Sequence, residues 1–402
     1  MAPAGRRRGI AVLVAGLAAG SIAGCGSSSV AAPPNYGDRV LPIGAVISQT
    51  GIGDSLGKQQ LKGIALASEV VNRARVNGAR VEVSVEDDTS DRDRGTALFK
   101  TMVEEKKVYA LVGPTLSNTA LGALPVAEAN HVPTVLVSSP GSGVVGTCAS
   151  PCTYAFRDSL GEAIAIPALV HSAAERLHPT RAVILYANDD RPSFDEASRF
   201  EQAFKDNGIV NAGPEAPGIS MSKLEGAPAR FVARALEEKP NIVAVSAAVL
   251  SAAIVVELRK AGYHGPILGG NAFNTPSVAA ATGEAGTDVQ VPSGYAIGAG
   301  DSANRDFVDA YRAKYQEAPD QAAAQAYTAV LLVAEALRQA NLAFTDLGAD
   351  RERVRGALEK VSINTPLGPF AFTPAHDVSQ RVWINQLDGK GGYQNVATVE
   401  PR

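Results

Sequence analysis

The chain has 402 residues, of which 46% are hydrophobic and 19% are charged. This composition is typical of a globular protein with a large core, and the length favours two domains. The formal net charge of −4 gives no electrostatic basis for binding nucleic acid, so we expect no DNA or RNA partner.

The N-terminal residues 1–24 have the features of an export signal and are left out of the fold. A positive segment at residues 6–8 precedes an apolar segment at residues 9–21, which is too short to span a hydrocarbon core of about 30 Å. The following sequence IAGC resembles a bacterial lipobox, in which Cys25 is lipidated. An ordinary secretory signal with an incidental cysteine is the alternative. We expect an exported protein, lipid-anchored on the extracytoplasmic side of the membrane through a flexible tether at residues 25–39.

The two remaining cysteines, Cys148 and Cys152, lie in the sequence GTCASPCTY. Export places them in an oxidising compartment, which favours a local disulfide. A metal would need further ligands, and the histidines show no paired spacing. The acidic run at residues 86–88 is interpreted as a strand end that caps the next helix rather than as a calcium site. We therefore expect no metal.

The stretch from Leu41 to Val71 has the pattern of a buried strand, a Gly-rich polar loop and a helix. A strand, loop and helix in this order place N–H groups and hydroxyls at the carboxyl edge of a parallel sheet. Ligands bind at that edge in open α/β sheets. Ser48, Thr50 and Ser55 are therefore candidates either for holding a ligand or for attacking one.

Strands and helices alternate along the rest of the chain. Further strands are expected at residues 81–86, 109–113, 133–137, 153–157, 182–186, 242–246 and 266–269. Helices are expected around residues 97–103, 119–129, 162–177, 194–207, 231–238 and 251–261. The last third is mainly helical, at residues 304–315, 322–339 and 350–361, and ends in hairpin-like strands at 368–372 and 381–386. This alternation predicts an α/β fold with parallel central sheets and two lobes.

The order of these segments resembles the type I periplasmic binding proteins, in the leucine/isoleucine/valine-binding branch that serves ABC importers. The matching pieces are IGAVISQTGIGDSLG, VEDDTSD, LVGPTLSNTALGALPVAE, VPTVLVSSPG, YAFRDS, LRKAG, QAYTAVLLVAEAL and TPLGPFAFTPAHD. The resemblance implies two Rossmann-like lobes joined by three hinge crossings, near residues 157–159, 294–296 and 364–367. It assigns residues 40–158 and 296–363 to lobe 1, and 159–295 and 364–402 to lobe 2.

The resemblance also implies which residues contact a ligand between the lobes. These are Thr50, Leu56, Ser117, Ser139, Gly141, Ser142, Phe194, Ala248, Asn271 and Tyr327. Loops with oriented N–H and O–H dipoles around Ser117 and Ser139 suit a carboxylate. A helix N-cap is the alternative role for Ser117.

The second lobe departs from the family's amino-acid binders. Where those proteins place an acidic residue against the ligand ammonium, this chain has Asn271. Ala248 and Leu56 stand where they have aromatic residues. Burying an ammonium without a carboxylate costs on the order of several kcal/mol. The resemblance therefore favours a neutral or carboxylate-only ligand with an apolar body over a free α-amino acid.

Two strings resemble enzyme motifs. Residues 53–57 satisfy G-x-S-x-G, but loop residues separate Ser55 from the strand, and His376 is the one histidine that suggests a partner. Residues 141–146 satisfy G-x-G-x-x-G, but no helix opens there. We expect no enzyme and no cofactor, but a monomeric solute-binding protein that delivers a small molecule to an ABC permease and ATPase complex. The alternatives are a sensor or receptor ectodomain, and a lipoprotein esterase using Ser55.

Overall fold

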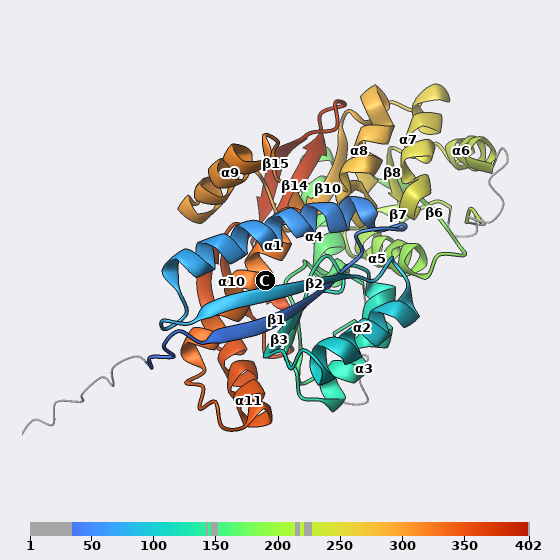
Figure 1. The fold of residues 1–402 in the computed structure, drawn as a ribbon. Coiled ribbons are helices and arrows are strands. Elements are labelled where there is room, and N and C mark those ends of the chain that lie inside the picture. The colour runs from blue at the N-terminus through green and yellow to red at the C-terminus, as the bar shows by residue number, and fades with distance from the viewer. Residues whose placement is uncertain (1–33, 142–143, 146–151, 214–217, 221–226, 401–402) are drawn as a thin grey trace, which may run out of the picture. The chain divides into compact units, whose positions relative to one another are not determined.

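The computed structural model describes residues 34–400, apart from 142–143, 146–151, 214–217 and 221–226. Its elements form two large sheets flanked by helices and a small third sheet (Figure 1). The predicted α/β fold with parallel central sheets is confirmed. Three residues with predicted roles, Cys25, Cys148 and Ser142, lie outside the described residues. Lipidation and the disulfide therefore stay predictions.

The first sheet has five parallel strands in the order β2-β1-β3-β4-β5. The strands are β1 (Val40–Ile47), β2 (Arg80–Asp87), β3 (Ala110–Val112), β4 (Thr134–Leu136) and β5 (Ala155–Arg157). The helices of this part are α1 (Asp54–Ala74), α2 (Arg92–Glu104), α3 (Ser117–Ala129), α9 (Ser302–Tyr315), α10 (Gln321–Gln339) and α11 (Leu347–Leu358).

Helices cover both faces of the first sheet, and the alternation of side chains along β1 explains why. Leu41 and Ile43 are buried in one core cluster with α1 and α10. Val46 points to the other face and packs with α2 and α3, which lie side by side (Figure 1). A strand sends successive side chains to opposite faces, so a nearly continuous apolar run suits a parallel strand buried on both sides.

The second sheet has seven strands in the order β15-β14-β10-β9-β8-β6-β7. Its strands are β6 (Arg181–Tyr186), β7 (Val210–Asn211), β8 (Ile242–Ser246), β9 (Ile267–Gly269), β10 (Val289–Ser293), β14 (Val382–Leu387) and β15 (Tyr393–Val399). Strands β6 to β10 are parallel, whereas β14 and β15 run antiparallel at one edge. Its helices are α4 (Glu162–Leu177), α5 (Arg191–Asp206), α6 (Ala227–Glu237), α7 (Ser251–Lys260) and α8 (Pro276–Thr282), with 3-10 turns η1 (Ala248–Leu250), η2 (Asn271–Asn274) and η3 (Gly283–Gly286).

The third sheet corrects the predicted C-terminal hairpin. Its antiparallel strands are β11 (Ser362–Thr365), β12 (Gly368–Phe372) and β13 (Val378–Ser379). Strand β14 pairs with β10 and β15 instead of β12, so the prediction that residues 368–372 and 381–386 pair with each other is wrong. Phe370 and Val378 belong to the core of the first sheet. We therefore propose that the third chain crossing follows Ser379, later than residues 364–367.

The acidic run at residues 86–88 holds the loop after β1. The Asp87 carboxylate accepts hydrogen bonds from the backbone N–H of Gln49 at 2.9 Å and from the hydroxyl of Thr50 at 2.8 Å. The N-cap of α2 is instead Asp91, which accepts from the N–H of Arg94. The predicted capping role thus belongs to a residue three positions beyond the run.

Candidate ligand-binding site

A cavity lies where segments of the two sheets meet. It is lined by the start of α1, the loop after β4, the crossing from β5 into α4, η2, the end of β10 and the start of α10. The lining residues are Leu56, Ser138, Pro140, Ser159, Leu160, Glu162, Ala165, Asn271, Asn274, Thr275, Pro292, Gly294, Gln321, Ala322 and Gln325. The cavity volume is about 30 Å³, space for about two water molecules. A larger ligand therefore requires the walls to move apart.

Of the residues expected to contact a ligand, Leu56 and Asn271 line this cavity. Leu56 lies in the first turn of α1, where Gly57 lets the helix pack closely on the preceding loop. A Cβ built on Gly57 would lie 1.9 Å from the carbonyl oxygen of Ser48. Any larger residue at position 57 would thus displace Leu56 from its place in the wall.

The loop after β4 contributes Ser138 to the cavity instead of the expected Ser139. Ser138 has a φ of 53°, and its hydroxyl donates to Oε1 of Gln325 at 2.7 Å. Ser139 is fully buried, and its hydroxyl lies 3.3 Å from the carbonyl oxygens of Pro114 and Val137. The hydroxyl of Ser139 is therefore engaged with the backbone, and the left-handed turn at Ser138 explains the shift by one residue.

The structure does not bring the other expected residues into the cavity lining. Tyr327 is buried in the core of the first sheet, with its ring centroid 4.7 Å from that of Phe307. Phe194 is 46% exposed. Ala248 begins the 3-10 turn η1 with a φ of 45°. None of these three residues is among those that line the cavity.

Two further expected residues, Thr50 in the loop after β1 and Ser117 at the start of α3, are also not among the lining residues. Thr50 is exposed and donates its hydroxyl to Asp87, as described above. Ser117 begins α3, and a Cβ built on Gly141 would lie 3.1 Å from its hydroxyl oxygen. Ser117 is therefore close to the loop after β4, and its role in binding stays a prediction.

Arg157 fixes that loop and was not predicted as a functional residue. Its guanidinium pairs with both carboxylate oxygens of Asp377. Its Nη1 also donates to the carbonyl oxygens of Pro140 at 3.2 Å and Gly141 at 2.9 Å. Arg157 thus joins the end of β5 to the loop after β4 and to the β12–β13 turn.

Two amide side chains of the wall are held by backbone groups and by a serine hydroxyl. Oε1 of Gln321 accepts hydrogen bonds from the hydroxyl of Ser293 at 2.6 Å and from the N–H of Gly294 at 3.0 Å. Nδ2 of Asn274 donates to the carbonyl oxygen of Pro292 at 2.8 Å. Polar groups fixed in this way are preorganised to orient a ligand.

Asn271 is held in place by a buried acid, Glu196. Oε1 of Glu196 accepts from the backbone N–H of Asn271 at 2.7 Å, and Oε2 accepts from the hydroxyl of Ser246 at 2.6 Å. Burial raises the pKa of Glu196, and these hydrogen bonds oppose the shift. A carboxyl group that accepts at both oxygens is best accommodated in its ionised form.

Glu162 brings a carboxyl group to the cavity itself, at the first turn of α4. The residue is 6% exposed, and its Oε2 has no hydrogen-bond partner among the described residues. Burial, together with the negative charge of Glu196, raises the pKa of Glu162 to about 9. Glu162 is not among the residues that the family resemblance implies as ligand contacts. The signal was present in RDSLGE, where the chain crosses into a helix.

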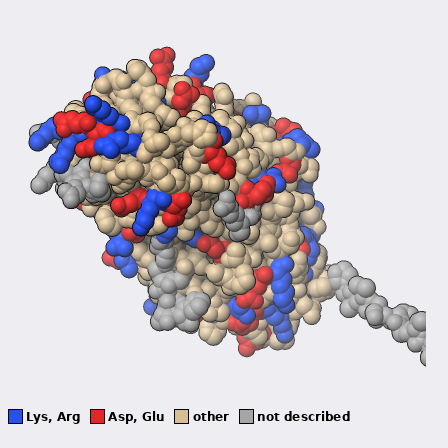
Figure 2. Space-filling view, turned by 180° about the vertical axis from the view of Figure 1, so that it is seen from behind, with Lys and Arg blue, Asp and Glu red and all other residues tan. Residues whose placement is uncertain are grey.

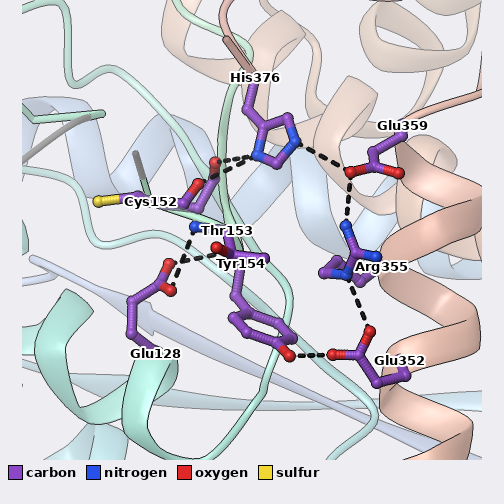
Figure 3. A network of polar contacts seen from close by, with 9 residues as sticks. Glu128, Cys152, Thr153, Tyr154, Glu352, Arg355, Glu359 and His376 are labelled. Atoms are coloured by element: carbon purple, nitrogen blue, oxygen red, sulfur yellow. Dashed lines mark hydrogen bonds and ion pairs between the residues drawn. The ribbon is translucent and has the colours of Figure 1, made fainter. Parts of the chain in front are cut away.

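The esterase alternative lacks the geometry it needs. Strand β1 ends at Ile47 and Ser55 lies within α1, so Ser55 is not on a tight turn directly after the strand. His376 belongs to a different network, in which its Nδ1 lies 3.1 Å from the carbonyl oxygen of Cys152 and its Nε2 lies 3.3 Å from Glu359 (Figure 3). The described residues therefore do not form the serine–histidine pair that the esterase alternative requires.

The network of Figure 3 ties the start of β5 to α3 and α11. The carboxylate of Glu128 accepts from the backbone N–H groups of Thr153 and Tyr154, and the Tyr154 hydroxyl donates to Glu352. Arg355 bridges Glu352 to Glu359. These contacts hold Tyr154 between α3 and α11, and it is not among the residues that line the cavity.

Two larger hollows lie elsewhere on the described part of the chain: one of about 420 Å³ shares Asn274 and Gln321 with this cavity, and one of about 600 Å³ lies between α4, α5 and the C-terminal strands. Figure 2 shows acidic and basic side chains interspersed over one face, with uncharged surface between them. Within the described part of the chain, no three His, Cys, Asp or Glu side chains are arranged to hold a metal ion. Over the same residues, every helix is too short or too polar to cross a membrane.

Comparison with known proteins shows the family to which the chain belongs. The model of the family described as periplasmic binding protein matches residues 40–392. The leucine-, isoleucine-, valine-, threonine- and alanine-binding protein of Pseudomonas aeruginosa is 25% identical over 373 residues, covering 90% of this chain and 91% of the relative.

Two solved structures share the fold. The branched-chain amino acid transporter substrate binding protein LivJ from Streptococcus pneumoniae, in complex with isoleucine, has a TM-score of 0.75 at 22% identity, covering 90% of this chain and 100% of that one. A solute binding protein of an ABC transporter from Rhodopseudomonas palustris, in complex with 3,4-dihydroxybenzoic acid, has a TM-score of 0.74 at 23% identity, covering 90% and 98%. The chain belongs to the periplasmic binding protein family, as a type I member of the leucine/isoleucine/valine-binding branch.

Proposed function

We propose that the protein is an extracytoplasmic solute-binding protein that captures a small ligand between its two lobes and delivers it to an ABC importer. The observation that carries this proposal is the cavity lined by segments of both sheets near the chain crossings. A site at the carboxyl ends of parallel strands, between parts joined by hinges, is suited to capture by closure.

The chemistry of the wall supports a small, partly apolar solute. Leu56, Leu160 and Ala165 offer apolar surface, while Asn271 and Gln325 offer amide groups. A few fixed polar groups on an apolar wall are typical of small-molecule sites. The ligands named for the two solved relatives, isoleucine and 3,4-dihydroxybenzoic acid, are small molecules. Each combines an apolar body with a carboxylate.

The finer parts of the proposal concern the anchor and the mode of action. The lipobox-like sequence at Cys25 supports a lipid anchor that keeps the protein beside its permease. The arrangement of Ser55 and His376 supports binding without catalysis. We propose that the protein acts as a monomer with the lobe boundaries given above, the third crossing being moved beyond Ser379.

Native mass spectrometry of the purified protein tests this function, followed by thermal shift against amino acids, amides and small carboxylates. We expect a co-purified molecule or a micromolar ligand that raises the unfolding temperature. Stabilisation follows because a ligand that binds only the folded state shifts the unfolding equilibrium. Ester hydrolysis that Ser55→Ala abolishes would contradict the proposal in favour of the esterase.

A further inference from the structure

We propose that Glu162 binds a cationic amine on the ligand, so that the solute is an amino acid or a related amine. This inference rests on the proposed function and names the class of its solute. Glu162 lies in the wall of the cavity together with Leu56 and Asn271.

The burial of Glu162 indicates that a partner is missing. The side chain is more than nine-tenths buried, and its Oε2 is enclosed without a hydrogen-bond partner among the described residues. Buried polar groups are normally paired, and an exception needs an explanation. Because Glu162 lines the cavity, a ligand is in a position to supply the partner. An ammonium group offers up to three N–H donors to a carboxylate.

The charges around Glu162 favour a cation over an anion in this part of the cavity. Glu196, which accepts hydrogen bonds at both oxygens, is a second buried acid close to Glu162. Of the described residues that line the cavity, none is basic. Two cations act on Glu162 from outside the lining: Arg157, whose guanidinium is committed to Asp377 and to backbone carbonyls, and Arg199 of α5. A ligand ammonium would offset the negative charge of Glu196 and pair with Glu162, whereas a carboxylate placed there would add a second negative charge beside Glu196.

The position of Glu162 explains how the site can bind an amine although residue 271 is an asparagine and not an acid. The Asn271 backbone is bound to Glu196, and its side chain lines the same cavity as Glu162. The acidic group therefore reaches the cavity from the first turn of α4 instead of from the segment after β9. Glu162 at the start of α4 thus supplies the amine-binding carboxylate that is missing at position 271.

Calorimetric titration of the wild-type protein and Glu162→Gln tests the inference. The probes are L-alanine, L-threonine, L-valine, L-leucine and L-isoleucine, each paired with its amine-free carboxylic acid, together with benzoate. We expect the wild type to prefer at least one amino acid over its amine-free acid. We expect Glu162→Gln to weaken the binding of that amino acid by about 30-fold or more. A loss of this size is typical when one partner of a buried charge pair is removed.

Matched variants separate loss of the charge from loss of the fold. Glu175→Gln changes an exposed acid of the same helix and should leave the affinity unchanged. Glu162→Asp keeps a carboxylate and should retain part of the preference for the amine. Equal amino-acid affinity in wild type and Glu162→Gln, or binding of amine-free acids alone, would overturn the inference and leave the proposed function standing. Binding of none of the probes would count against both.

Proton release on binding gives a second readout, which a purely structural role would not move. Glu162 is faced by Asp195, Glu196 and Arg199 of α5 and by Arg157 of β5. In this setting its high pKa keeps Glu162 protonated near neutral pH, so an arriving ammonium should displace the proton. Titration at pH 7 in buffers of different ionisation enthalpy should show up to one proton released by the wild type and fewer by Glu162→Gln. Equal proton release in the two proteins would contradict the proposed pairing.

Discussion

The carboxylate of Glu196 accepts a hydrogen bond from the backbone N–H of Asn271, with 2.7 Å between Oε1 and N. This contact joins α5 to the segment that follows β9 and fixes one wall of the cavity. The other oxygen of the same carboxylate accepts from Ser246 at the end of β8. One buried acid thus holds two adjacent strand ends of the second sheet.

Replacing this acid by its amide should destabilise the fold. Glu196→Gln puts an NH₂ group against either the Asn271 N–H or the Ser246 hydroxyl, so one buried hydrogen bond is lost. The expected cost is about 1–3 kcal/mol in the free energy of unfolding, measured by urea denaturation. Glu201→Gln, an exposed acid on the same helix, is the control and should change little. Equal stability of the two variants would show that the contact is not important.

Leu56 tests whether the apolar wall contributes to binding. Leu56→Ala removes apolar surface from the cavity, and we expect the ligand affinity to fall by about tenfold, or roughly 1.4 kcal/mol. Ile52→Ala, in the preceding loop, is a matched control because Ile52 is 86% exposed. Calorimetry with the best ligand measures both. Affinity lost equally in both variants, or in neither, would be evidence against the proposed wall.

Arg157 should be essential for the shape of the loop after β4. Arg157→Ala leaves Asp377 without its partner and frees the carbonyls of Pro140 and Gly141. We expect a loss of about 2–4 kcal/mol in stability, together with weaker ligand binding. Arg181→Ala breaks an exposed pair with Glu238 and should cost about 1 kcal/mol or less. Similar losses for the two variants would contradict the assigned role.

The raised pKa of Glu162 predicts a dependence of stability on pH. Because the pKa rises from 4.5 to about 9 on folding, the folded protein holds this proton more tightly than the unfolded chain. The contribution to stability is fully present below pH 4.5 and is lost as the pH rises to about 9. Glu162→Gln removes this titration, so without ligand it should exceed the wild type at pH 8 by about 1 kcal/mol or more.

Urea unfolding at pH 5 and pH 8 measures this difference. The gap between Glu162→Gln and the wild type should widen toward pH 8, whereas Glu175→Gln should follow the wild type at both values. A constant gap would mean that Glu162 does not titrate across this range.

The fold was predictable because its signals are local and repeated. Alternating strand and helix patterns, such as the buried run of β1 followed by α1, specify layers without long-range information. The C-terminal strands were harder to place, because the pairing of β14 with β10 joins segments about 90 residues apart. Local periodicity identifies such strands but not their neighbours.

The cavity was predictable only in part, since a wall is assembled from several elements. Leu56 and Asn271 lie in the segments that follow β1 and β9, and the family resemblance implied both. Ser138 differs from the predicted Ser139 by a single left-handed turn, which is not evident from residue types alone. Glu162 begins α4 just after a chain crossing and Gln321 begins α10, so neither residue follows a strand end.

The most direct test of the central claim is calorimetric titration of the wild-type protein with the panel of amino acids and small carboxylates. We expect saturable binding of one ligand per chain in the micromolar range, weakened by Leu56→Ala and unchanged by Ile52→Ala. The proposed function would be contradicted if no compound bound and no small molecule co-purified, and the proposed wall if a ligand bound with an affinity that Leu56→Ala did not change.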